Sequence, residues 1–138
     1  MTRVFDTNIL IDYLKGVVGA REEFDRPGER LISIVTFMEV LAGAADDEEE
    51  DVIDMFLRDF RIVDISRKIA RETVALRKTH RIRLPDAVIW STARVEGAQL
   101  VTRDTSHFPD NDPGVRAPYT LTPPAPRRKA SARRRASR

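Results

Sequence analysis

Four carboxylates of this chain lie in or directly beside apolar segments, where an ionised side chain is costly unless it is paired or bound to a cation. They are Asp6, Glu39, Asp86 and Asp104. If the fold gathers them, four like charges need a counter-ion, and a hard divalent cation such as Mg²⁺ or Mn²⁺ prefers oxygen ligands. The pattern therefore predicts metal-assisted chemistry on a phosphodiester. The competing interpretation, scattered helix caps and surface acids, does not explain why all four acids flank apolar runs.

The elements around these acids would carry them to one edge of a sheet. Apolar runs alternate with segments of helical periodicity, which predicts a three-layer α/β/α fold with a mostly parallel sheet of about five strands. The expected strands span residues 3–6, 31–34, 62–65 and 99–102, with a short edge strand within 115–121. Asp6 and Asp104 then follow strand ends, and Glu39 and Asp86 lie in early helical turns. Ligands of such folds bind outside the carboxyl ends of the strands, where the strand order switches, so one shared site is expected.

Composition excludes several classes of protein. The chain has no Cys, which rules out disulfides, thiolate metal ligands and a Cys nucleophile. Asp6 and Asp12 interrupt the apolar residues near the N-terminus, so no secretory signal is expected. No segment reaches the roughly 18 consecutive apolar residues of a membrane span. We therefore expect a cytoplasmic protein that makes no contact with a membrane.

Charge divides the chain into an acidic body and a basic tail. Residues 127–138 hold seven Lys and Arg residues and no acid, which leaves 17 basic and 22 acidic residues in 1–126, a net charge of −5. We expect one domain over residues 1–122 and a Pro-containing linker with a basic tail over 123–138. The tail is either a disordered, solvated terminus or an arm that binds phosphate groups.

Each of the four acids lies in a short segment, and the four segments occur in an order that can be compared with known protein families. They are FDTNILID at 5–12, TFMEVLAG at 36–43, LPDAVIW at 84–90 and LVTRDT at 100–105. Together they resemble a PIN domain, specifically the small ribonuclease toxins of VapBC-type toxin–antitoxin pairs. The resemblance covers about residues 1–121, and its strength comes from the four segments together.

The resemblance implies a fold, an activity and a partner. The implied fold is a five-stranded parallel sheet between helices, and the implied activity is Mg²⁺- or Mn²⁺-dependent endoribonuclease cleavage of RNA. The implied partner is a cognate antitoxin that blocks the site of a homodimer. The acids of the implied site are Asp6, Glu39, Asp86 and Asp104, and its small polar groups are Thr7, Asn8 and Thr102. In the mechanism that we expect, Asp6, Asp86 and Asp104 bind one or two cations, and Glu39 is either a ligand or the base that orients a water.

Residues close to the acids have simpler interpretations as well. Thr7 or Asn8 is expected to cap the helix that follows the first strand, and Thr102 could be an ordinary strand residue. Asp12 is expected to be a solvated helix residue, with a peripheral role in the site as the alternative. Arg103 adjoins the expected site and is either a phosphate ligand or half of a surface ion pair.

The remaining candidates and two other functions are less well supported by the sequence. His80 and His107 are expected at the surface, and Trp90 in the core. One alternative function is a catalytically inert PIN-like module that binds RNA or protein. Another is a phosphatase that uses Asp6 as its nucleophile, although Asn8 stands where such an enzyme would be expected to have a second acid.

Overall fold

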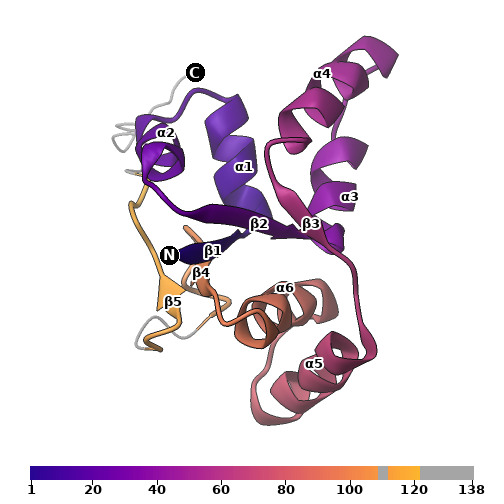
Figure 1. The fold of residues 1–138 in the computed structure, drawn as a ribbon, viewed down its shortest axis with the longest axis vertical. Coiled ribbons are helices and arrows are strands. Elements are labelled where there is room, and N and C mark those ends of the chain that lie inside the picture. Colours follow the sequence, from indigo (N-terminus) through magenta and orange to yellow (C-terminus); the bar gives the residue numbers. More distant parts are fainter. Residues whose placement is uncertain (109–111, 122–138) are drawn as a thin grey trace, which may run out of the picture.

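Five parallel strands form the middle layer of the structure, a computed structural model that describes residues 1–108 and 112–121 (Figure 1). The strands are β1 (Thr2–Phe5), β2 (Glu29–Ser33), β3 (Arg61–Val63), β4 (Gln99–Val101) and β5 (Val115–Arg116). Their order across the sheet is β3-β2-β1-β4-β5, and every neighbouring pair is parallel. The parallel sheet expected from the sequence is confirmed. The strand expected within 115–121 is the two-residue edge strand β5.

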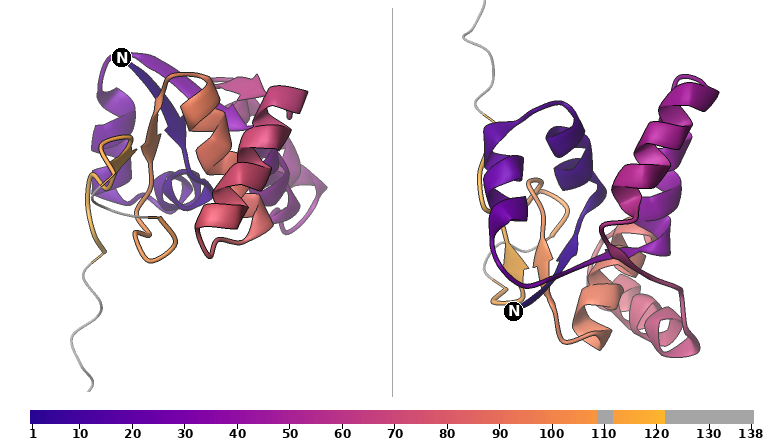
Figure 2. Two further views of the ribbon diagram at one scale, coloured as in Figure 1. Left: turned by 90° about the horizontal axis from the view of Figure 1, so that it is seen from below. Right: turned by 45° about the horizontal axis from the view of Figure 1, so that its top comes forward.

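Helices cover both faces of this sheet. They are α1 (Thr7–Leu14), α2 (Val18–Asp25), α3 (Ile34–Ala42), α4 (Asp47–Leu57), α5 (Arg67–Thr79) and α6 (Leu84–Val95). Helices α1 to α4 lie on one side of the sheet and the pair α5 and α6 on the other (Figures 1 and 2). The three-layer α/β/α architecture is therefore confirmed. Within the described part of the chain, no helix has the length and apolar character that crossing a membrane requires.

The strands are apolar on both faces because helices bury both faces. One core cluster lies between the sheet and the pair α5 and α6, and its strand residues include Val4, Leu31 and Leu100. The next residue of each strand points to the other cluster, between the sheet and the remaining helices; these residues are Phe5, Ile32 and Val101. All six are fully buried. Trp90, with 1% of its surface exposed, belongs to the first cluster, as expected.

The start of α1 differs from the expectation. Asp6, rather than Thr7 or Asn8, is the N-cap residue, and its Oδ1 accepts a hydrogen bond from the backbone N of Thr7 at 2.8 Å. An N-cap side chain satisfies a backbone N–H that has no partner within the helix. One carboxylate thus begins the helix and lies in the candidate site, and Thr7 and Asn8 stand on the first turn with their side chains available for other contacts.

The expected domain and tail can be compared with the structure only in part. The described body ends at Leu121, close to the expected boundary at residue 122. The linker and basic tail expected over 123–138 lie outside the described residues, as do residues 109–111.

Candidate active site

The candidate site lies where the strand order switches. From β1 the chain proceeds outward to β2 and β3, and it then returns to the other side of β1 with β4. Asp6 directly follows β1 and Thr102 directly follows β4, and the backbone N of Asp6 donates to the carbonyl of Val101 at 2.8 Å. This is the edge at which ligands of open parallel sheets bind, as expected from the sequence.

Asp6 is the buried centre of the site, with 5% of its surface exposed. Its Oδ2 accepts hydrogen bonds from the hydroxyl of Thr102 at 2.8 Å and from Nδ2 of Asn8 at 3.2 Å. Burial raises the pKa of Asp6 to about 6, although the hydrogen bonds from the Thr102 hydroxyl and the Thr7 backbone N lower it, and the charges of Asp86 and Glu39 raise it further. The structure thus brings three of the four expected acids close enough to repel one another.

Glu39 is held at the site by a chain of hydroxyl groups. It lies on α3, which begins directly after β2, and its Oε1 accepts a hydrogen bond from the Thr7 hydroxyl at 2.6 Å. The Thr7 hydroxyl is also 3.0 Å from the hydroxyl of Thr36, which is fully buried. Because Thr7 has one hydroxyl hydrogen, Thr36 is the donor in the second bond. The sequence interpretation missed Thr36, although it stands three residues before Glu39 and thus on the same helical face.

Asp86 carries the least satisfied oxygen of the site. It lies in the first turn of α6, where the helix dipole favours negative charge. Its Oδ2 is buried and has no hydrogen-bond partner among the described residues. The nearest basic side chains are Arg83 and His107, whose Nε and Nδ1 atoms are each 3.9 Å away. A buried carboxylate oxygen without a donor is unusual and points to a cation as its missing partner.

Asp104 lies at the same edge but turns toward its own loop. Its Oδ1 accepts hydrogen bonds from the hydroxyl and the backbone N of Ser106, and its Oδ2 is 3.0 Å from Nδ1 of His107. The bond from the Ser106 hydroxyl is the main reason why the pKa of Asp104 is lowered. His107 is half-exposed, as expected, yet it lies between Asp104 and Asp86.

Asn8 and Thr102 connect Asp6 to the segment that carries Asp104. The hydroxyl oxygen of Thr102 accepts from the backbone N of Asp104 at 3.1 Å, and Oδ1 of Asn8 accepts from the backbone N of Arg103 at 3.2 Å. Interpreting Asn8 as a helix cap was wrong, because Asp6 is the cap. Both side chains hold the two strand ends together around the central acid.

Asp12 is a buried anchor, so its interpretation as a solvated residue was wrong. Only 3% of its surface is exposed. The Arg103 guanidinium donates to both of its carboxylate oxygens, at 2.5 and 3.1 Å, and the Tyr119 hydroxyl donates to Oδ2 at 2.7 Å. Asp12 stands four residues after Asn8 on α1, so the two share the helical face that looks toward β4. This spacing was the signal in the sequence that Asp12 would point inward.

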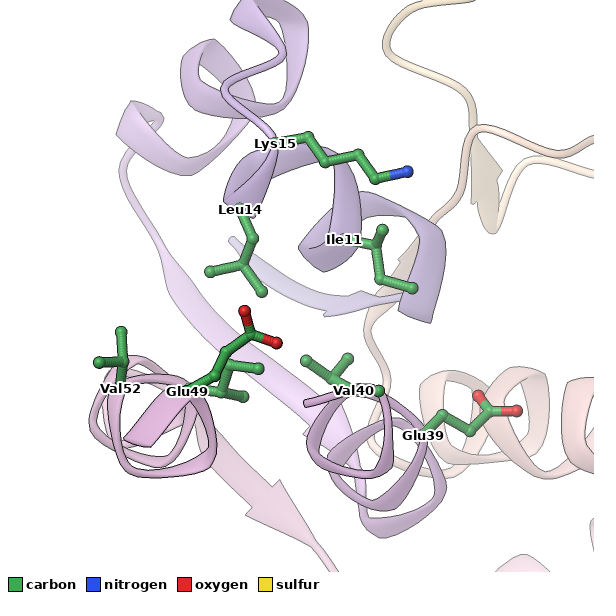
Figure 3. A pocket seen from close by; sticks show the side chains of 9 residues that line it. Ile11, Leu14, Lys15, Glu39, Val40, Glu49 and Val52 are labelled. Atoms are coloured by element: carbon green, nitrogen blue, oxygen red, sulfur yellow. The ribbon is translucent and has the colours of Figure 1, made fainter. Parts of the chain in front are cut away.

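An apolar groove of about 450 Å³ lies beside the acids, between α1, α3 and α4. Figure 3 shows Ile11, Leu14 and Val40 pointing into the space between these helices. Glu39 lines its edge, so the groove and the acidic site share a residue. Ile11 and Leu14 are each more than a third exposed, which is a large apolar surface beside a charged one.

The donor set suits a hard divalent cation, because every candidate ligand is a carboxylate oxygen. The crowding of Asp6, Glu39 and Asp86 and the unpartnered oxygen of Asp86 fit such a cation as well. Within residues 1–108 and 112–121, however, no three Asp, Glu, His or Cys side chains lie in an arrangement that could hold a metal ion without rearrangement. The contacts of Asp104 with Ser106 and His107 keep its carboxylate engaged elsewhere.

Comparison with known proteins agrees with this geometry. The PIN domain family matches residues 3–112. Ribonuclease VapC10 of Mycobacterium tuberculosis (strain CDC 1551 / Oshkosh) is 35% identical over 112 residues, with 75% of this chain and 84% of the relative covered. Ribonuclease VapC1 of Methanocaldococcus jannaschii is 30% identical over 111 residues, with 75% of this chain and 76% of the relative covered. A chain in a solved toxin–antitoxin complex from Klebsiella pneumoniae is 41% identical, with a TM-score of 0.81 and coverage of 86% of this chain and 99% of that one. The chain therefore belongs to the PIN domain family and to its VapC ribonuclease branch.

Proposed function

We propose that this chain is an endoribonuclease that depends on a divalent cation, Mg²⁺ or Mn²⁺, and that it acts as the toxin of a type II toxin–antitoxin pair. The observation that carries the proposal is the buried acidic site at the strand switch. Asp6 ionises there only near pH 6, and the buried Oδ2 of Asp86 has no donor among the described residues. Relatives named as ribonucleases support RNA as the substrate.

The cation would be held by Asp6, Asp86 and Asp104, with Glu39 as a further ligand or as the base that orients a water. Bound there, it would lower the pKa of a water and neutralise charge on the scissile phosphate. For Asp104 to take part, its carboxylate must exchange its present contacts for the cation. The three ligands come from the junction of β1 and α1, from α6 and from the segment after β4, so the fold rather than any one element assembles the site.

The small polar residues hold the acids in place. Thr102 and Asn8 donate to Asp6, and Thr7 donates to Glu39. The hydrogen bond from Thr102 favours the ionised form of Asp6, which is the form that binds a cation. We therefore assign Thr7, Asn8 and Thr102 positioning roles.

The site favours attack by water over a covalent route. The chain has no Cys, and both oxygens of the buried Asp6 already accept hydrogen bonds. In-line attack by a water with departure of the 3′ oxygen would leave a 5′-phosphate on the product. Because both oxygens of Asp6 accept hydrogen bonds, the alternative in which Asp6 is the nucleophile of a phosphatase is disfavoured as well.

RNA cleavage in Mg²⁺, in Mn²⁺ and in EDTA tests the proposal. The wild type should cleave in either metal and not in EDTA, and Asp86→Asn should lower the rate by about 100-fold or more because it removes a charged ligand. Asp51→Asn, at an exposed position on α4, is the matched control and should cleave like the wild type. Equal rates for Asp86→Asn and the wild type would show that the acids are not catalytic. If the wild type is inactive and also binds no metal, the inert binding module becomes the better assignment.

An antitoxin is the proposed partner, in line with the toxin–antitoxin complex among the similar structures. We expect it to place an Arg or Lys side chain against Asp6, Glu39, Asp86 and Asp104, where a cation would otherwise bind. The apolar groove that ends at Glu39 offers it an adjoining surface (Figure 3). The proposed assembly is a cytoplasmic homodimer bound to antitoxin. Growth arrest on induction of the chain alone, and rescue by the neighbouring reading frame, are the expected results; growth without arrest counts against a toxin.

A further inference from the structure

A second hollow, here called the basic groove, opens where the chain passes from α5 to α6, next to Asp86. It has a volume of about 400 Å³ and is lined by Arg77, His80, Arg81, Ile82 and Arg83. These residues form the last turns of α5 and the short connection to α6, whose first turn carries Asp86. Because Nε of Arg83 is 3.9 Å from Oδ2 of Asp86, the groove adjoins the acidic site directly.

The groove lies in a segment whose charge is opposite to that of the rest of the body. Residues 67–83 hold seven of the 17 Lys and Arg residues of 1–126 but only one of its 22 acids, Glu72. That acid is 2.8 Å from Arg94 of α6, so it does not neutralise the groove. The segment 67–83 is thus strongly positive within an otherwise acidic body, and its C-terminal end borders the acidic site.

The cations of the groove are accessible and largely unpaired. Arg77, Arg81 and Arg83 are all exposed. Within residues 1–108 and 112–121, Arg83 is the only one of the three with a carboxylate within 4 Å. Nε of Arg77 donates to the carbonyl of Ile82 at 3.2 Å, which fixes its guanidinium at the wall of the groove.

Stability of the helices does not account for this arrangement. The dipole of α5 favours positive charge at its last turn, which explains Arg77 and Lys78. Arg81 and Arg83 come after α5 has ended. Arg83 is moreover the N-cap residue of α6 and makes no capping hydrogen bond, at a position where positive charge is unfavourable and Ser, Thr, Asp or Asn are preferred.

We propose that the basic groove binds phosphate groups of the RNA strand whose scissile bond lies at the acidic site, with Arg81 and Arg83 as the principal contacts. This inference rests on the proposed ribonuclease function and adds where the substrate is held. A guanidinium matches a phosphate in charge and geometry, since it can donate two parallel hydrogen bonds. The acids repel the RNA backbone, so attraction has to come from a neighbouring surface, and the basic groove is next to Asp86.

Two matched double variants of the full chain test the proposal. The groove variant is Arg81→Gln with Arg83→Gln, and the control is Arg67→Gln with Arg71→Gln. Both remove two exposed Arg charges, and both keep the basic tail. The control positions lie ten and six residues before Arg77 on α5, which is about 15 and 9 Å along the helix axis. Binding of a short, fluorescent, single-stranded oligoribonucleotide is measured by anisotropy in EDTA, across a series of salt concentrations.

The groove variant should bind about 25-fold more weakly at about 0.1 M salt, and the slope of log K against log salt should fall by about 1.4, since each phosphate contact on single-stranded RNA contributes about 0.7. The control should stay within about threefold of the wild type because Arg67 and Arg71 make no proposed phosphate contact and salt weakens their longer-range attraction. Equal weakening of both variants would show that only net charge matters, and an unchanged groove variant would show that RNA binds elsewhere; either result overturns the proposal. Because binding is measured without metal, loss of the proposed cleavage activity would leave this result standing.

Discussion

The raised pKa of Asp6 makes the stability of the metal-free protein depend on pH in a predictable direction. The pKa is about 6 in the folded chain, against about 3.9 for an unperturbed Asp. Folding therefore favours the neutral form, and the unfolded chain ionises first as the pH rises. The stability that the neutral form contributes is complete below about pH 4 and is lost as the pH rises through 6.

The size of the effect follows from the difference between these two values. A difference of about two pKa units corresponds to roughly 3 kcal/mol of unfolding free energy in total, of which about 2 kcal/mol is lost between pH 4.5 and pH 7. Acids whose pKa is lowered by folding change the stability of the protein in a lower pH range than Asp6 does. Although burial opposes it, hydrogen bonds from Arg3 and Arg116 lower the pKa of Glu23, and the pKa of Asp104 is lowered as well. The stability that these two acids contribute is lost only below about pH 4.5.

Urea unfolding in EDTA, at a series of pH values from 4.5 to 7, measures the effect when the wild type is compared with Asp6→Asn. The substitution disturbs the hydrogen bonds from Thr7, Asn8 and Thr102, but that cost does not vary with pH in this range. The stability of the variant relative to the wild type should therefore improve by about 2 kcal/mol as the pH rises from 4.5 to 7. If the two proteins show the same pH dependence, Asp6 ionises normally and the account of a crowded, desolvated acid is wrong.

Two further predictions concern Asp12 and its partner Tyr119, which lie beside the candidate site. In urea unfolding, Asp12→Asn should lower the free energy of unfolding by about 3 kcal/mol, which is the lower end of the range for breaking a buried ion pair because Arg103 is partly exposed. Asp54→Asn is the control: it removes an exposed ion pair on a helix and should lower the free energy of unfolding by about 0.5 kcal/mol or less. Gly19→Ala should be destabilising, although Ala is favoured over Gly in a helix by up to about 1 kcal/mol, because the new Cβ would lie 2.6 Å from Cγ of Tyr119. In a Tyr119→Ala background the same change should become stabilising, and a substitution that keeps its sign in both backgrounds would rule out the contact.

The fold and the main acids could be predicted because their signals are local. Buried parallel strands are short apolar runs, and Asp6 directly follows such a run. Glu39 and Asp86 stand on helices that begin at the same edge of the sheet, so the topology alone brings them near Asp6. Sequence reasoning works here because each step needs only neighbouring residues and the rule that parallel strands end at one edge.

The anchor and the details of the acids could not be predicted because they depend on distant residues. The spacing from Asn8 places Asp12 on the inward face of α1, but its partners Arg103 and Tyr119 are 91 and 107 positions away, and no local pattern indicates either contact. The orientation of Asp104 is set by a loop hydrogen bond from Ser106, which would compete with the proposed cation for the same carboxylate. For Asp12, burial by distant residues decided the outcome. For Asp104, a hydrogen bond within its own loop decided the orientation of the carboxylate.

In the mechanism that we propose, the acidic site and the basic groove act in opposite ways on an RNA backbone, and this difference is why a cation would be needed. Without a cation, the crowded charges around Asp6 repel a phosphate, while the cations beside Asp86 attract the neighbouring ones. RNA in EDTA should therefore occupy the groove and leave the scissile phosphate outside the acids. A divalent cation removes that repulsion, because it replaces like-charge crowding with oxygen ligation. The order that follows is attraction at the groove first and neutralisation at the acids second, which would let the protein hold RNA without cutting it until the metal is bound.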